Sequence, residues 1–149
     1  MSIGFEPSSP LRRSRFGDVS LAVPSGWCAT TEAGQPPTLS LPDGVGALQL
    51  SVGIYVSGAL PDFSPEALRN LLLDERRELG PPSDLVLESS PRLAAATFHL
   101  GNDDARIWYV SDGVNVAMVT YLSEAPLNRA ELADAEAMVR SLTFVAGTA

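Results

Sequence analysis

The sequence predicts an α+β fold in which a single antiparallel β-sheet of about six to seven strands carries two packed helices. Residues 48–56 alternate apolar and polar side chains, the pattern of a half-buried strand. Residues 64–79 and 128–142 instead repeat apolar side chains at helical spacing. Several strand-like segments separate the two helices, so the regular strand–helix alternation of a parallel sheet is absent and an antiparallel sheet is expected.

Three strands are predicted ahead of the first helix. In residues 16–23, Val19, Leu21 and Val23 alternate with smaller side chains, and the Pro-Ser-Gly sequence at 24–26 ends the segment. A short strand at 38–41 ends at the Pro-Asp-Gly turn of residues 42–44. The amphipathic strand 48–56 follows, so these two segments are expected to form a hairpin.

Both helices carry start signals. Ser64 is a hydroxyl N-cap and Pro65 occupies the first helical position, while Gly80 ends the segment. Asn128, with Glu131 three residues later, resembles a capping box and starts the second helix, which is expected to end before Phe144.

The region between the helices predicts an antiparallel meander over residues 85–88, 92–100, 105–111 and 114–122. Asp112 and Gly113 are expected to form a two-residue turn, because this dipeptide favours tight hairpins. That turn would pair Ser111 with Val114 and therefore Trp108 with Ala117.

The chain of 149 residues, 45% of them apolar, suits one domain over residues 16–145. Residues 1–15 are rich in Ser and Pro, lack an apolar period and are predicted to be loosely ordered, and residues 146–149 form a tail. No apolar run approaches the roughly 20 residues that span a bilayer, so no membrane insertion is expected. The N-terminus shows no export signal, and the single cysteine, Cys28, cannot form an internal disulfide, which favours a cytoplasmic protein.

The net charge argues against nucleic acid as a partner. Eighteen acidic and ten basic residues give −8, and an acidic protein is repelled by a phosphate backbone.

The order of these elements resembles the Mog1/PsbP-like superfamily and, within it, the bacterial DcrB-like proteins. The features that match are the first strand with its ending Pro24-Ser25-Gly26-Trp27, the strand 48–56, the helix start Phe63-Ser64-Pro65, the hairpin 106–121 and the final helix ending at 140–144. The resemblance implies a binding module, since members include photosystem subunits, Ran-binding proteins, lipoproteins and chaperones or adaptors for type VI secretion effectors. It implies no catalytic residues, and the anchor cysteine of the lipoprotein members is absent here.

The inventory of reactive side chains predicts no enzyme, no cofactor and no metal. The single histidine, His99, reads as a partly exposed residue near a strand end, and Cys28 reads as a small buried thiol. One Cys and one His cannot supply a structural zinc site, residues 102–104 form a solvated turn rather than a calcium loop, and phosphate-binding glycine motifs are absent. Hydrolysis by two carboxylates stays open, although helix acids such as Glu75 and Glu78 are expected to face solvent.

Three functions compete for this chain. The first is a non-enzymatic cytoplasmic protein-binding module, such as a secretion-effector chaperone or adaptor. The second is an immunity protein that neutralises a co-encoded basic toxin, for which an acidic domain is suited. The third is a small-molecule binding domain or an unrecognised hydrolase, which would need a deep pocket. The expected partner is another protein or, in a homodimer, a second copy of this chain.

Two predictions concern individual side chains. Trp27 is expected to be a buried structural anchor, because the turn before it directs its ring over the core. One face of the hairpin 106–121 is expected to be an open binding surface, since it mixes aromatic residues, Arg and small apolar residues as interface cores do. Its residues are Arg106, Trp108, Val110, Asn115, Ala117, Val119 and Tyr121. The other, more aliphatic face is expected to lie under the helices, and its residues are Ile107, Tyr109, Val114, Val116, Met118 and Thr120. A loop or the N-terminal segment that covers the binding face is the alternative, as is a three-residue turn, which would exchange the two faces.

Overall fold

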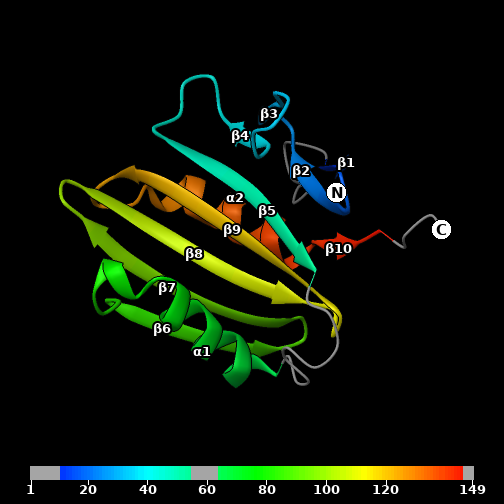
Figure 1. Cartoon of the computed structure of the whole chain (residues 1–149). Helices are drawn as coiled ribbons and strands as arrows, with labels where there is room; N and C mark the ends of the chain where they lie inside the picture. The colour runs from blue at the N-terminus through cyan, green and yellow to red at the C-terminus, as the bar shows by residue number, and fades with distance from the viewer. Residues whose placement is uncertain (1–10, 55–63, 146–149) are drawn as a thin grey trace, which may run out of the picture.

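The computed structural model describes residues 11–54 and 64–145 (Figure 1). The chain begins with strands β1 (Leu11–Phe16), β2 (Val19–Pro24), β3 (Cys28–Thr30), β4 (Thr38–Ser40) and β5 (Gly46–Ile54). It continues with helix α1 (Pro65–Glu75), the 3-10 turn η1 (Arg77–Leu79) and strands β6 (Asp84–Ser89), β7 (Arg92–Leu100), β8 (Asp103–Ser111) and β9 (Asn115–Glu124). Helix α2 (Arg129–Arg140) and the short β10 (Thr143–Phe144) close it. None of the helices in these two ranges is long and apolar enough to cross a membrane.

Seven strands form the main sheet in the order β3-β4-β5-β9-β8-β7-β6, and every neighbouring pair is antiparallel. A small second sheet has the order β1-β2-β10. The α+β class and the meander between the helices are confirmed, because β6 to β9 are hairpin-connected neighbours. The small sheet was not predicted.

Both predicted helix starts are confirmed. Ser64 Oγ accepts a hydrogen bond from the Ala67 N–H at 3.2 Å, and Pro65 is the first helical residue. Asn128 Oδ1 accepts from the Glu131 N–H at 2.9 Å. The Glu131 carboxylate does not close a capping box and is used elsewhere in the fold.

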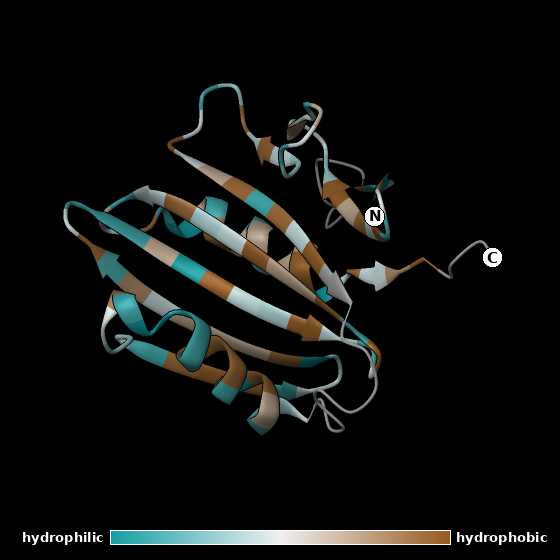
Figure 2. Cartoon of the chain, in the orientation of Figure 1, coloured by the Kyte–Doolittle hydropathy of each residue, from teal (hydrophilic) through white to brown (hydrophobic). Residues whose placement is uncertain are grey.

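One helix packs on each face of the main sheet, with α1 in front of β6 and β7 and α2 behind β9 in Figure 1. Leu68 and Leu72 of α1 pack on Phe98 of β7 and Ile107 of β8. The opposite face packs against α2 and β2, and Figure 2 shows the apolar bands that alternate along these strands. The expectation that both helices cover the same aliphatic face is therefore wrong.

The β8–β9 hairpin has a longer loop than predicted. Ser111 pairs with Val116, and Trp108 pairs with Val119 instead of Ala117. The reason is that Asp112 Oδ1 accepts hydrogen bonds from the N–H groups of Val114 and Asn115, at 2.9 and 2.8 Å, which closes a wider turn. The register moves by two residues, so each side chain stays on its predicted face.

Residues 11–15 are ordered, which contradicts the prediction of a loose segment up to residue 15. They belong to β1, which pairs with β2 around a turn at Gly17, where φ is +63°. Arg12 Nη2 donates to the Trp27 carbonyl at 2.9 Å, and Arg13 Nη2 donates to the Ser141 carbonyl at the end of α2, also at 2.9 Å. Residues 1–10 and the predicted tail 146–149 lie outside the described residues.

The prediction for Trp27 is confirmed, since only 1% of its surface is exposed. Its indole Nε1 donates to Asp134 Oδ2 of α2 at 2.9 Å. Trp27 thus joins the loop after β2 to the helix that covers the sheet.

Candidate functional site

The face predicted as an open binding surface is buried in the monomer. Trp108 and Tyr121 are 0% exposed, and Ala117, Val119 and Val110 are at most 2% exposed, because α2 and β2 pack over them. Asn115 lies at the end of this row, as the first residue of β9, and is half-buried. The prediction that this face is accessible to a partner is wrong, and the cover is α2 with β2 rather than the loop or N-terminal segment considered as the alternative.

Arg106, which was expected to anchor a partner, has its partners within the chain. Its guanidinium donates to Asp84 Oδ1 of β6 at 2.8 Å and to Glu136 Oε2 of α2 at 3.3 Å. It also lies over the Trp108 ring, 5.9 Å from the ring centre. A buried cation needs such partners, so Arg106 fastens α2 to the edge of the sheet.

A second ion pair extends this fastening. Arg140 of α2 donates to both carboxylate oxygens of Glu88 on β6 and to Glu136 Oε1. The hydrogen bond from Arg140 outweighs the opposing effect of burial and holds the pKa of Glu88 below its ordinary value of 4.5.

This shift predicts an acid-sensitive contribution to stability. A lowered folded-state pKa means that the contribution is complete above the ordinary pKa of Glu88 and is lost as the pH falls through the folded value. Chemical unfolding between neutral pH and about pH 3 should therefore show a smaller acid-induced loss of stability for Glu88→Gln than for the parent chain. Parallel acid curves for the two proteins would contradict this role of Glu88.

The opposite face of the main sheet is only partly covered. Along β5 and β9, residues that face α2, such as Leu48, Val119 and Tyr121, are buried. On the α1 side Val116 is also buried next to α1, but the residues farther from that helix are exposed or half-buried. Helix α1 packs on β6, β7 and β8 and makes no extensive contact with β4 or β5. We call the α1-side surface of β4, β5 and β9 the open half-sheet; its residues are Thr38, Gln49, Ser51, Met118, Thr120 and Leu122.

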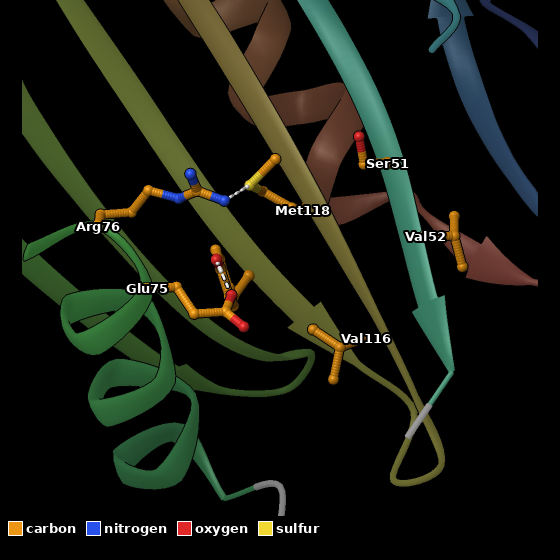
Figure 3. A pocket seen from close by; sticks show the side chains of 7 residues that line it. Ser51, Val52, Glu75, Arg76, Val116 and Met118 are labelled. Carbon is orange, nitrogen blue, oxygen red and sulfur yellow. Dashed lines mark hydrogen bonds between the residues drawn. The ribbon is translucent and has the colours of Figure 1, made fainter. Parts of the chain in front are cut away.

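A cavity lies where the open half-sheet meets the end of α1 (Figure 3). It encloses about 200 Å³. Its wall has an apolar part, from Val52, Val116 and Met118, and a polar part, from Ser51, Glu75, Arg76 and Tyr109. This volume exceeds that of a few waters and is smaller than the roughly 300–1,000 Å³ of a typical small-molecule site.

Arg76 is the C-cap of α1, and its side chain reaches across the cavity to β9. Nη2 donates to the Met118 sulfur at 3.0 Å, and the buried Nε has no hydrogen-bond partner among the described residues (Figure 3). A thioether sulfur is a weak acceptor, so the guanidinium is poorly satisfied for a group that is largely removed from water.

Tyr109 lines the cavity and stays protonated. Its hydroxyl donates to Glu75 Oε1, and burial, followed by this contact with a carboxylate, raises its pKa far above the ordinary value. Tyr109 is therefore a fixed donor at neutral pH and cannot act as a general base.

A smaller cavity of about 150 Å³ lies on the same side of the sheet, lined by residues that include Thr30, Thr38 and Gln49. Both cavities thus open on the α1 side, next to or within the open half-sheet.

In the described part of the chain, His99 and its neighbours on the sheet do not pair a nucleophile with a base. His99, Asp104 and Ser123 occupy one row of β7, β8 and β9, and Asp104 bonds to the His99 ring. The aspartate lies between the histidine and the serine, whereas nucleophilic catalysis requires the base beside the nucleophile.

Cys28 is exposed, which contradicts the prediction of a buried thiol, because it lies on the edge strand β3. Within residues 11–54 and 64–145, no group of three or more His, Cys, Asp or Glu is placed to hold a metal ion.

Sequence reasoning missed Arg76 and Met118. An arginine at the end of a helix is ordinary, and Met118 was assigned to an aliphatic face beneath the helices. The signal available was the break in apolar content along β5, where Gln49 and Ser51 replace the apolar residues that a covered face requires.

Comparison with known proteins gives the fold alone. No model of a known protein family matches the sequence. No curated protein matches it either. The solution structure of cyanobacterial PsbP (CyanoP) from Synechocystis sp. PCC 6803 is similar, with a TM-score of 0.55 and 12% identity over 97% of this chain and 98% of that one.

A crystal structure from Bacteroides thetaiotaomicron VPI-5482 is also similar, with a TM-score of 0.58 and 14% identity. The alignment covers 85% of this chain but only 44% of that one, so the present chain spans less than half of the Bacteroides protein. The chain has a PsbP/Mog1-like α+β fold, as the sequence predicted. The narrower resemblance to DcrB-like proteins stays a prediction.

Proposed function

We propose that this chain is a non-enzymatic, cytoplasmic protein-binding module that contacts its partner through the open half-sheet. The observation that carries the proposal is the difference between the two faces of β5 and β9. Tyr121 and Leu48, on the α2 side, are 0% exposed, whereas Leu122, on the α1 side, keeps 42% of its surface exposed. The sealed face has no room for a partner.

The composition of the open half-sheet supports a protein as the partner. Its residues are small, polar or apolar, and none is charged, while the buried centres of protein interfaces are depleted in charge and enriched in Met. The cavity of about 200 Å³ suits one inserted side chain better than a drug-sized ligand. The exposed thiol of Cys28 is consistent with a reducing compartment.

Site-specific photo-crosslinking in the native cell tests this proposal. A photoreactive amino acid at Gln49 or Leu122, both exposed on the open half-sheet, should capture a defined protein. The same amino acid at Ala137, exposed on α2, is the matched control and should not capture it. Capture from position 137 with none from 49 and 122 would contradict the proposal.

The identity of the captured protein separates the finer roles. A secreted effector indicates a chaperone or adaptor, a toxin indicates an immunity protein, and a second copy of the chain indicates a homodimer.

A further inference from the structure

The cavity at the end of α1 has a chemistry that goes beyond general protein binding. We infer that it is a binding site for a carboxylate group, held by the guanidinium of Arg76 and followed by a short apolar stem that lies against Val52, Val116 and Met118. This inference deepens the proposed function, because it assigns a chemical group to one end of the open half-sheet.

The first argument is the state of Arg76. A guanidinium has five N–H donors in a planar fork. Here Nη2 donates to the Met118 sulfur, and Nε is buried without a partner in the described part of the chain. Among the described residues, Arg76 forms no ion pair, whereas Arg106 and Arg140 each bond to carboxylates. Arg76 is thus a partly buried cation that lacks the anionic acceptor its geometry suits.

The second argument is the shape and lining of the space beside it. The cavity of about 200 Å³ holds a carboxylate and a few methylene groups, and Figure 3 shows Arg76 and Met118 meeting across it with Val116 further along the wall. Apart from Arg76 and Glu75, the polar residues of the wall are neutral: Tyr109 keeps its proton and donates it in a hydrogen bond to Glu75, and Ser51 carries a hydroxyl. An amino group would face the guanidinium itself, which repels it.

The third argument concerns Glu75, the carboxylate among the described residues that line the wall. Its Oε1 accepts the Tyr109 hydroxyl, so this acid is engaged in the wall of the cavity. It sets a limit on binding, because a second carboxylate must approach from the side of Arg76 and Met118. The Nη groups would make this contact, since Nε is buried, and two N–H donors to one carboxylate give the stronger, bidentate pair.

Butyrate is a suitable probe, since it has one carboxylate and a short apolar stem, and butyramide is its neutral match. Titration of the isotope-labelled full chain with butyrate, followed by NMR, should shift the Arg76 Nε–H signal and the amides of Ser51 and Met118. The shifts should saturate in roughly the millimolar range expected for so small a ligand. Butyramide should bind at least about tenfold more weakly.

Arg76→Gln should abolish the saturable shifts, and Arg76→Lys, which keeps the charge but loses the fork, should weaken binding at least about tenfold. Arg77→Gln is the matched control, because Arg77 is the next residue and 79% of its side chain is exposed. It should bind butyrate as the parent does. The inference would be overturned if butyramide bound as tightly as butyrate or if Arg76→Gln bound butyrate as the parent does. It would also be overturned if butyrate gave no saturable shift, because the cavity would then hold only water.

Two short peptides identify the source of the carboxylate. One carries a single Glu and an amidated C-terminus, and the other lacks acidic side chains but has a free C-terminus. If the first peptide competes with butyrate, the carboxylate comes from an acidic side chain of the partner. If the second competes, it comes from the C-terminus of the partner. If neither competes, the ligand is a small free acid. Crosslinking from Gln49 does not depend on Arg76, so failure of the carboxylate site and failure of the protein-binding proposal give different results.

Discussion

Replacing Trp27 by alanine is expected to lower the free energy of unfolding by about 3–5 kcal/mol, the range for a buried large-to-small substitution. The indole is 1% exposed and packs in the cluster shared by β2, α2 and the main sheet. The substitution removes this packing and leaves Asp134 without its donor. Denaturant unfolding measures the loss, and a decrease below about 1 kcal/mol would contradict the anchoring role.

Two milder variants separate packing from hydrogen bonding at this position. Trp27→Phe keeps most of the apolar volume and removes the donor to Asp134, whereas Asp134→Ala removes the acceptor and keeps the ring. Each should lower stability by only about 0.5–2 kcal/mol, because the net value of one hydrogen bond is small. The difference in the free energy of unfolding between these variants and Trp27→Ala then gives the contribution of the packing of the indole.

Glu131→Ala is expected to lower the free energy of unfolding by roughly 2–4 kcal/mol, since it leaves several donors without an acceptor. Glu131 is 6% exposed and accepts from the Val45 N–H at 2.9 Å, the Gly46 N–H at 3.1 Å and the Tyr121 hydroxyl at 2.6 Å. These bonds tie the loop before β5 to the start of α2. Chemical unfolding at neutral pH gives the measurement.

Glu131→Gln and Tyr121→Phe are the controls. The glutamine keeps the volume and one acceptor oxygen, so it should lose less than the alanine, and Tyr121→Phe removes a single donor. The loop lies close to the tyrosine: a methyl group at Gly46 would be 2.5 Å from Tyr121 Oη. If all three variants matched the parent in stability, Glu131 would not hold this loop.

Local signals in the sequence were sufficient for most elements. Ser64 and Asn128 cap the two helices as predicted, because N-capping depends on a few neighbouring residues. The turn at Gly17 and Asp18 was missed, because residues 11–15 lack the apolar alternation of a half-buried strand, although a Gly-Asp dipeptide favours a hairpin. The loop at Asp112 was predicted too short, since side-chain bonds to the backbone stabilise the longer turn.

The candidate site could not be predicted to the same extent. The alternation in β8 and β9 assigned each side chain to a face, and the two-residue change in register preserved that assignment. Which face stays open depends on where α1 and α2 cross the sheet, and this is decided by contacts between residues far apart in the sequence, such as Arg106 with Glu136 and Trp27 with Asp134. The face with Arg106, Trp108 and Tyr121 was therefore predicted to be an interface from its composition, although it belongs to the core.

The affinity of the crosslinked partner for two matched variants tests the central claim most directly. Leu122→Glu places a charge on the open half-sheet, and Ala137→Glu places the same charge on the exposed side of α2. Calorimetric titration should give a dissociation constant at least about tenfold higher for Leu122→Glu and an unchanged one for Ala137→Glu, because a charge buried in an interface is strongly unfavourable. Weakened binding by Ala137→Glu, with Leu122→Glu binding as the parent does, would contradict the assignment of the binding face.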